Sequence, residues 1–172
     1  MFLKLRAEWT KESDYVDALT KKYRDQYKRA RKKADGIEKR QLTLEEINQL
    51  EDEIYTLYRH VADHAPFNTF FLAKNHFYSL KKELGDAFRF FAYFENGELI
   101  GFNTLIHHDE ILETYFLGYD EKIQKEKMLY GYQEHLMMML IQITHLKHMP
   151  KASRHHFYLQ IQSHMILKIH KH

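Results

Sequence analysis

The feature that most constrains this chain is a two-residue turn signal, Asn96-Gly97, placed between two apolar runs. Asparagine and glycine both tolerate the positive φ that a tight hairpin turn needs at its two central positions. Residues 88–95 (FRFFAYFE) and 98–106 (ELIGFNTLI) flank the turn, and a third apolar run covers residues 111–117. The side-chain period of about two residues predicts three antiparallel strands in succession.

Helical periodicity precedes this region. Tyr15, Leu19, Tyr23 and Tyr27 recur every four residues, which predicts one long amphipathic helix with these side chains on its buried face. The helix ends in the basic run KRARKK and stops at Gly36. Positive charge at this end suits the negative pole of the helix dipole.

Two further helices are expected before the three strands. Thr43 and Glu46 have the spacing of a capping box, so a helix begins there, with a buried stripe that reaches Val61. Gly85 ends the next helix, whose buried side chains are expected to be Phe70, Phe71, Phe77, Leu80 and Leu84.

The order of elements indicates the fold class. A short strand over residues 37–42 comes before the two helices, and residues 121–148 and 155–162 predict a long helix and a last strand after the hairpin region. We therefore expect an α/β (α+β) fold with a mixed, mainly antiparallel sheet. Residues 1–36 form an extra N-terminal basic helix in this interpretation, and residues 37–172 form the main domain.

Composition excludes several classes of protein. The chain has no cysteine, which rules out disulfides, thiolate zinc sites and a cysteine nucleophile. With 44% hydrophobic residues the chain can form a core, yet its longest apolar runs are too short to span a bilayer. The first residues, MFLKLRAEW, lack the pattern of a signal peptide. We expect a globular protein in the cytoplasm, without a transmembrane segment.

Strand, two helices, three strands, helix and strand is the order found in GNAT-superfamily N-acyltransferases, and the chain resembles them. The stretches that carry the resemblance are KKYRDQYKRARKKADGIE, LYRHVADHAPFNT, LKKEL, ELIGFNTLI and FLGYD. They are similar to a bacterial branch labelled peptidoglycan biosynthesis or recognition proteins, which is related to the aminoacyl transferases that extend peptidoglycan bridges. The resemblance implies helices on both faces of the sheet and transfer of an acyl or aminoacyl group to an amine.

The resemblance also implies where the donor lies. Residues 111–117 would form the strand that diverges from its neighbour, so that the pantetheine arm of an acyl-CoA pairs with exposed backbone groups. Leu117, Gly118 and Tyr119 would then contact the donor. Tyr115 is the candidate catalytic residue beside them, and Tyr130 is a candidate acid. Because the chain has twelve tyrosines, each is also open to interpretation as a half-buried structural aromatic.

Two departures from the family pattern affect the choice of donor and the expected activity. The glycine-containing loop of acetyl-CoA enzymes is absent, and Asp120 and Glu121 stand where a diphosphate would bind. This disfavours ordinary acetyl-CoA and relatively favours an aminoacyl-tRNA or other acyl donor. The last 22 residues, KASRHHFYLQIQSHMILKIHKH, do not match the expected further helix and strands and resemble a truncated or out-of-frame end. An inactive remnant or binding module is therefore the main alternative.

Three other motifs have a functional and a structural interpretation. Lys28, Arg29, Arg31, Lys32 and Lys33 would suit RNA phosphates or form a solvated helix end. His107 and His108 point to opposite faces of a strand, so we expect no metal site. The run MMML at residues 137–140 suits either the core or the surface of a homodimer.

Overall fold

The computed structural model describes residues 2–4, 11–65, 68, 70–108, 111–127 and 158–160. The elements in chain order are β1 (Phe2–Lys4), α1 (Glu12–Ala18), α2 (Lys21–Lys33), β2 (Glu38–Gln41), α3 (Leu44–Gln49), α4 (Glu51–Asp63), α5 (His76–Leu84), the 3-10 helix η1 (Gly85–Ala87), β3 (Phe88–Glu95), β4 (Glu98–His108), β5 (Ile111–Tyr119), α6 (Glu121–Lys127) and β6 (Tyr158–Gln160).

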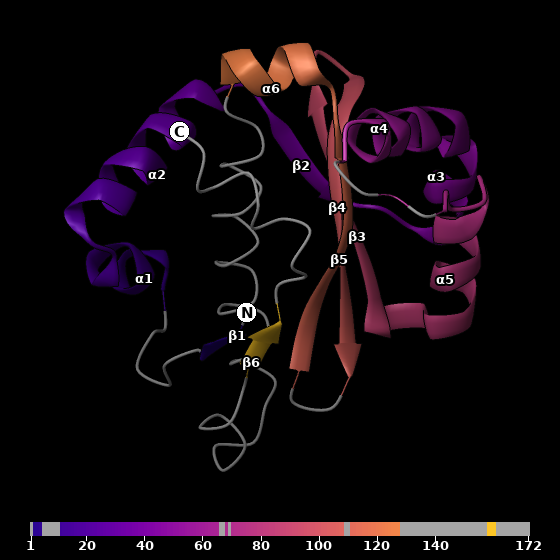
Figure 1. Ribbon diagram of the computed structural model, residues 1–172, viewed down its shortest axis with the longest axis horizontal. Coiled ribbons are helices and arrows are strands. Elements are labelled where there is room, and N and C mark those ends of the chain that lie inside the picture. The colour runs from indigo at the N-terminus through magenta and orange to yellow at the C-terminus, as the bar shows by residue number, and fades with distance from the viewer. Residues whose placement is uncertain are drawn as a thin grey trace.

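The strands form one six-stranded sheet in the order β1-β6-β5-β4-β3-β2. Every neighbouring pair is antiparallel except β5 and β6, which are parallel. Helices α3, α4 and α5 cover one face, α1 and α2 lie on the other side, and α6 crosses one end of the sheet (Figure 1). The predicted fold class, a mixed and mainly antiparallel sheet with helices on both faces, is confirmed.

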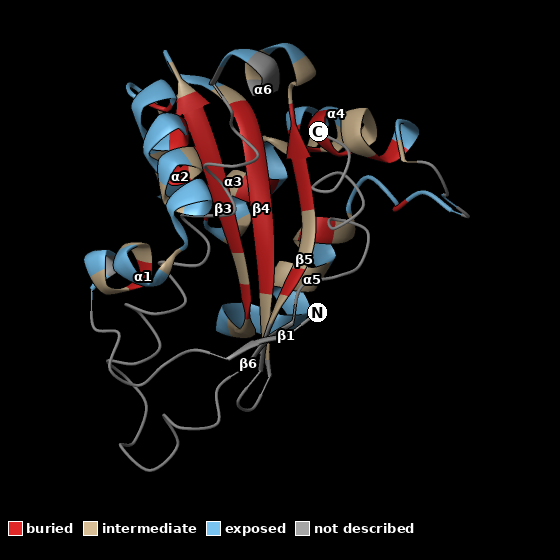
Figure 2. Cartoon of the chain, turned by 60° about the vertical axis from the view of Figure 1, so that its left-hand side comes forward, coloured by how far each residue is buried: buried red, intermediate tan, exposed pale blue. Residues whose placement is uncertain are grey.

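The hairpin predicted at Asn96-Gly97 is present. Asn96 has φ 52° and Gly97 has φ 84°, so both turn residues take the positive φ that asparagine and glycine tolerate. β3 and β4 pair from Phe88 opposite Ile106 to Glu95 opposite Glu98. The middle of β3 and β4 is buried (Figure 2), because helices cover one face and a second apolar cluster lies on the other.

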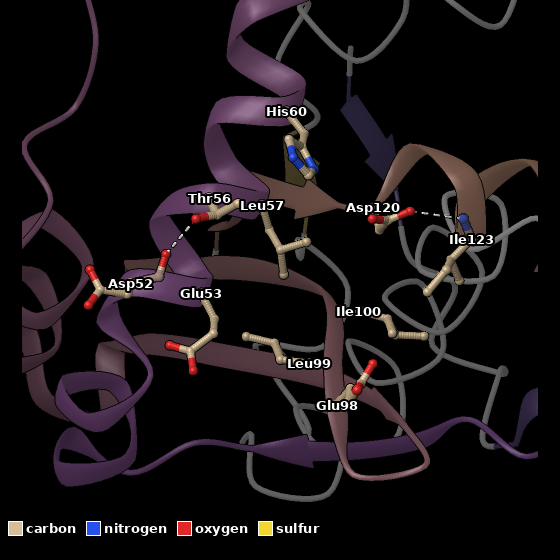
Figure 3. A pocket seen from close by; sticks show the side chains of 10 residues that line it. All are labelled: Asp52, Glu53, Thr56, Leu57, His60, Glu98, Leu99, Ile100, Asp120 and Ile123. Atoms are coloured by element: carbon tan, nitrogen blue, oxygen red, sulfur yellow. Dashed lines mark hydrogen bonds between the residues drawn. The ribbon is translucent and has the colours of Figure 1, made fainter.

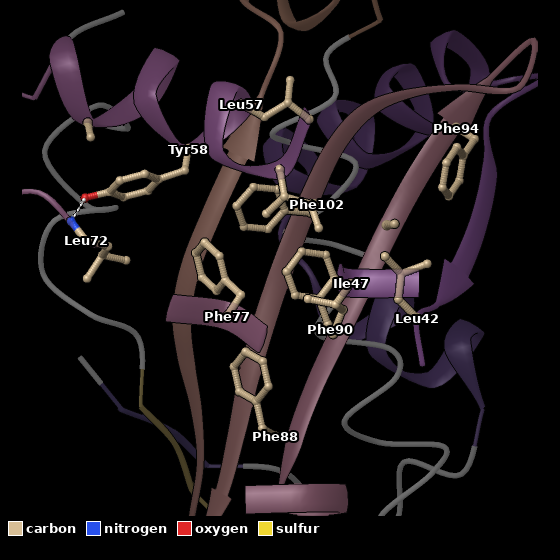
Figure 4. Close-up of a cluster of buried hydrophobic side chains, with 13 residues drawn as sticks. Leu42, Ile47, Leu57, Tyr58, Leu72, Phe77, Phe88, Phe90, Phe94 and Phe102 are labelled. Carbon is tan, nitrogen blue, oxygen red and sulfur yellow. Dashed lines mark hydrogen bonds between the residues drawn. The ribbon is translucent and has the colours of Figure 1, made fainter. Parts of the chain in front are cut away.

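The main core lies between the sheet and helices α3 to α5. Phe77 of α5 packs edge-on against Phe90 and Phe102, with ring centroids 5.7 and 5.1 Å away, and Phe90 stacks on Phe102 at 4.9 Å (Figure 4). Tyr58 of α4 lies at the edge of this core and accepts a hydrogen bond from the Leu72 amide at 3.0 Å (Figure 4). These contacts fix α4 and α5 against the central strands.

The single long N-terminal helix predicted from the tyrosine period is wrong. Leu19 is extended (φ −69°, ψ 145°) and ends α1, and α2 begins after Thr20. Arg24 stabilises the break, because its Nη2 donates to the Asp17 and Leu19 carbonyls at 2.9 Å each. The break changes the helical phase, which leaves Tyr23 at 43% exposure rather than on a buried face.

The helix predicted from Thr43 begins as expected but divides. The Thr43 amide donates to Glu46 Oε2 at 2.8 Å and the Glu46 amide to Thr43 Oγ1 at 3.2 Å, which is the predicted capping box. Leu50 departs from helical geometry (φ −97°, ψ 17°) and separates α3 from α4.

The next helix is shorter than predicted. Gly85 ends α5 with φ 54°, as expected, but the helix starts only at His76. Phe70 and Phe71 therefore lie outside it and are 67% and 48% exposed. The Arg59 guanidinium covers the Phe71 ring at 4.0 Å, a cation–π contact that the helical period does not reveal.

Other sequence predictions fall partly outside the described residues. Helix 121–148 is described only as α6, so Tyr130 and residues 137–140 lie outside the described part, and strand 155–162 is described as β6. β1, which no pattern predicts, pairs with β6 in the same sheet. Among the described helices, none is long and apolar enough to cross a bilayer.

Candidate active site

Within the described residues, one edge of β5 lacks a strand partner over part of its length. β6 pairs with β5 only at Ile111, Leu112 and Glu113. In the described part of the chain, no strand pairs with this edge from Tyr115 to Gly118. Since alternate backbone groups of a strand point to each edge, this segment presents N–H and C=O groups to any extended molecule that lies beside it.

A bulge interrupts β5 at the start of this open edge. Thr114 lies opposite Leu105 and Leu117 opposite Asn103, so Tyr115 and Phe116 together face the single residue Thr104. The Thr104 hydroxyl bridges the irregularity: Oγ1 accepts from the Phe116 amide at 2.9 Å and donates to the Phe116 carbonyl at 2.7 Å. The bulge breaks the regular alternation of backbone groups where the edge becomes free.

Tyr115, predicted as a catalytic residue, is hydrogen-bonded to a histidine that sequence reasoning missed. Its hydroxyl lies 3.0 Å from His76 Nε2 of α5, and the two rings stack at 5.9 Å. Burial raises the pKa of Tyr115, with Glu113 and Tyr58 adding to the effect, and burial lowers the pKa of His76. Both groups are therefore neutral near pH 7. No local signal marks His76, because it is 39 residues from Tyr115 and only the fold brings them together.

The three predicted donor contacts follow on β5. Gly118 packs against α4: a Cβ on it would overlap Phe102 Cε1 and sit 2.7 Å from the Leu57 carbonyl carbon. Leu117 and Tyr119 belong to the apolar cluster on the other face. The side chains of Leu117 and Tyr119 therefore pack inside the protein, and a ligand beside this edge would meet the backbone of Leu117 and Gly118.

At the end of β5 a carboxylate caps α6. Asp120 Oδ1 accepts from the amides of Lys122 at 2.8 Å and Ile123 at 3.1 Å. The cap borders a pocket of about 330 Å³ between α4, β4 and α6 (Figure 3). Its polar lining includes Asp52, Glu53, Glu98, Asp120 and His60. Lys74 pairs with Asp52, but the lining is acidic overall.

The profile of the acetyltransferase (GNAT) domain family matches residues 21–159. The chain belongs to this family. No curated protein matches it.

Solved structures share the fold at low sequence identity. An aminoglycoside acetyltransferase from an uncultured soil metagenomic sample, solved with trehalose, has a TM-score of 0.51 at 13% identity over 80% of this chain and 88% of its own. A possible acetyltransferase from Clostridium difficile 630 has a TM-score of 0.51 at 9% identity over 74% and 80%. A conserved protein of unknown function from Bacteroides thetaiotaomicron has a TM-score of 0.54 at 15% identity over 92% of this chain; the match spans 51% of that protein.

GNAT acetyltransferases use acyl-CoA, and the residues present fit only part of that molecule. The open edge of β5 suits the amide-bearing pantetheine arm. The start of α6 does not fit the diphosphate, because Asp120 already occupies two of its amides and adds negative charge. Carboxylates in the neighbouring pocket increase the repulsion of a phosphate.

The predicted nucleic-acid residues lie away from this edge on α2. Lys28, Arg29, Arg31, Lys32 and Lys33 are all exposed. A shallow pocket of about 410 Å³ is lined by Tyr27, Lys28, Arg31, Lys32 and Asp35. Within the described residues, no group of three or more metal-ligating side chains occurs.

Proposed function

We propose that this GNAT domain transfers an acyl group from an activated donor to an amine, with the donor extended along the open edge of β5. The observation that carries the proposal is that, in the described part of the chain, no strand pairs with this edge of β5 at residues 115–118, beside the bulge at Tyr115. An extended arm with amide groups can pair with such an edge as an added strand does.

The length of the edge suits a donor with a long arm. Asp120 follows Tyr115 by five residues, which corresponds to roughly 16 Å at about 3.3 Å per residue. In this arrangement the acyl group lies at the bulge, near Tyr115, and the arm passes the backbone of Leu117, Gly118 and Tyr119. The bulk of the carrier then lies beyond Asp120.

The reaction has simple chemical requirements. The amine nitrogen attacks the acyl carbon, a C–N bond forms, and the bond from that carbon to the leaving sulfur or oxygen breaks. A proton must leave the amine and one must reach the leaving atom, while negative charge develops on the carbonyl oxygen. A backbone N–H at the free edge beside the bulge is suited to stabilise that charge. Tyr130 remains a predicted acid for the leaving atom.

The donor class follows from the fit of the site. Asp120 and the acidic pocket disfavour a diphosphate at the start of α6. Binding of the proposed donor therefore does not require a phosphate group at that position. An acyl-CoA would bind mainly through its arm, and an aminoacyl-tRNA would bind through its ester end. The exposed basic residues of α2 could hold the phosphates of a tRNA at a distance from β5, which favours the aminoacyl-tRNA as donor.

Hydrogen exchange measured by mass spectrometry tests the proposal. Adding acetylpantetheine or acetyl-CoA is expected to slow exchange of β5 amides between residues 115 and 118, while β3, which is paired on both sides, serves as the unchanged control. Product formation is then followed with a panel of amines, including cell-envelope precursors, because the implied peptidoglycan role is also a proposal. Protection without product would favour the inactive binding module, and no protection by any acyl donor would refute the proposal.

RNA binding through α2 is a second candidate function. It rests on five exposed basic side chains within about one and a half turns of helix, beside the buried Tyr27. Because the run KRARKK contains no acidic residue, it forms a local positive surface on a protein of net charge +2.

A further inference from the structure

We infer that His76 and Tyr115 form the proton-transfer pair of the acyl transfer proposed above. The inference rests on that proposed function and adds to it a histidine from α5. Tyr115 Oη and His76 Nε2 are 3.0 Å apart, which is within hydrogen-bond distance for proton transfer. Tyr115 is also the first residue of the bulge, so the pair lies where the open edge of β5 begins.

Aromatic rings hold the pair in place. The His76 ring stacks on Tyr115 with planes 26° apart and meets Phe77 and Phe116 edge-on at 5.5 and 6.5 Å. Tyr115 meets Phe116 edge-on at 4.7 Å. Such packing restricts the rotamers of both side chains and keeps their polar atoms aligned.

The electrostatic surroundings keep both groups neutral and ready to exchange a proton. Burial lowers the pKa of His76 and raises that of Tyr115, so it opposes both the imidazolium and the phenolate. Glu113 on β5 and Tyr58 on α4 are the titratable groups that act on Tyr115, and both raise its pKa. In the tautomer with the His76 proton on Nδ1, Tyr115 donates and Nε2 accepts.

The proton balance of the step is complete with these two groups. As the amine nitrogen attacks the acyl carbon, its proton passes to Tyr115 Oη while the phenolic proton passes to His76 Nε2. When the bond to the leaving sulfur or oxygen breaks, the imidazolium returns a proton through Tyr115 to that atom. The amide product and the protonated carrier leave, and both side chains regain their starting forms.

Two conservative variants test the pair. Tyr115→Phe keeps the ring and removes the hydroxyl, and His76→Gln keeps a hydrogen-bond acceptor that cannot take the proton. Each is expected to lower kcat about 10²- to 10⁴-fold with little change in the donor KM, because only proton transfer is lost. The kcat of the double variant is expected to be little lower than that of either single variant, since the two residues act as a unit. Tyr78→Phe, on the same helix α5, is the matched control.

The pH profile separates catalysis from a structural role. The wild-type kcat/KM is expected to fall on the acid side as His76 takes up a proton, and His76→Gln is expected to lack that limb while melting near the wild-type temperature. Full activity of Tyr115→Phe, or an unchanged acid limb in His76→Gln, overturns the inference while the transferase proposal stands. A wild-type protein that transfers nothing from any donor overturns both.

Discussion

At the scale of single residues, Gly118 decides how closely α4 approaches the sheet. A Cβ there would meet the backbone of Leu57 and Tyr58 at 2.7 and 2.8 Å, and backbone atoms of a packed helix cannot move aside cheaply. The family resemblance predicts this glycine as a contact for the donor. Its observed environment assigns it a packing role on the α4 side and leaves its backbone at the open edge.

Gly118→Ala is expected to destabilise the protein by about 1–3 kcal/mol, because the added methyl group overpacks the contact between α4 and β5. Gly36→Ala provides the control: Gly36 has φ 83° and open space around the position of an added Cβ, so only backbone strain of about 1 kcal/mol is introduced. Urea denaturation measures the loss of unfolding free energy in both variants. Equal losses in the two variants would contradict the packing explanation.

Lys39 of β2 is a second residue whose behaviour depends on its surroundings. Its ammonium nitrogen is buried, has no hydrogen-bond partner among the described residues, and lies 4.5 Å from the centroid of the Phe91 ring. Burial lowers the pKa of Lys39 to about 7. The folded protein therefore favours the neutral amine, whereas the unfolded chain keeps a normal lysine pKa near 10.5.

This difference predicts a pH-dependent stability. Between pH 7 and pH 10 the unfolded chain holds a proton that folded Lys39 has lost, so the contribution of Lys39 to stability rises with pH, by at most about 1.4 kcal/mol per unit. Lys39→Met keeps the stem and is expected to remove this slope. Denaturation at pH 7, 8 and 9 gives the comparison, with the exposed Lys22→Met as the charge control. If the free energy of unfolding changed with pH equally in the wild type and in Lys39→Met, the proposed contribution of Lys39 would be ruled out.

At the scale of elements, β5 and α6 together define the candidate site. β5 has a bulge and, within the described residues, no strand partner on one edge at residues 115–118. α6 begins with a carboxylate that accepts hydrogen bonds from two amides of its first turn. A helix start of this kind is closed to a second anion, although the same position in a family that uses acyl-CoA would hold a diphosphate. Donor preference should therefore depend on one side chain, Asp120.

Asp120→Asn is expected to raise the affinity for acetyl-CoA relative to acetylpantetheine, because asparagine still caps a helix but carries no charge. In the wild type the two donors are expected to bind with similar affinity. Calorimetric titration with each donor gives the ratio of the two affinities. Glu126→Gln, which removes an exposed charge from the same helix, is the control. A wild-type ratio already strongly in favour of acetyl-CoA would show that the cap does not exclude the diphosphate.

At the scale of the whole molecule, charge is distributed unevenly. The basic residues of α2 lie on the side of the sheet opposite α3 to α5 (Figure 1), whereas the pocket between α4, β4 and α6 is acidic. A polyanion is therefore expected to approach α2 and avoid the pocket. This separation is what an RNA-borne donor, or an RNA partner, would require.

Binding of RNA through α2 should weaken steeply with salt. Replacing Lys28, Arg29 and Lys32 by glutamine is expected to reduce affinity and the slope of log K against log salt by about two, at about 0.7 for each lost contact with a single strand. Fluorescence anisotropy with a short single-stranded RNA measures this, and Lys82→Gln, which removes an exposed charge from α5, is the control. Absence of binding at low salt would remove RNA as a partner of this surface.

The sequence alone determined those parts of the protein whose cause is local. The Asn96-Gly97 turn, the capping box at Thr43 and the stop at Gly85 are predictable because each depends on the conformation or hydrogen bonding of residues close in the chain. The alternation of apolar residues likewise indicates the hairpin. The divided helices are not predictable in this way, because the breaks at Leu19 and Leu50 carry neither proline nor glycine.

Only the tertiary structure decided the features that depend on distant residues. His76 meets Tyr115 across 39 residues, burial lowers the pKa of Lys39, and Gly118 is confined by a helix from a much earlier part of the chain. The pairing of β6 with Ile111–Glu113 of β5 likewise joins distant parts of the chain. Sequence periodicity reports which face of an element is buried, but not what lies against that face, and it is this contact that sets distances and pKa values at the site.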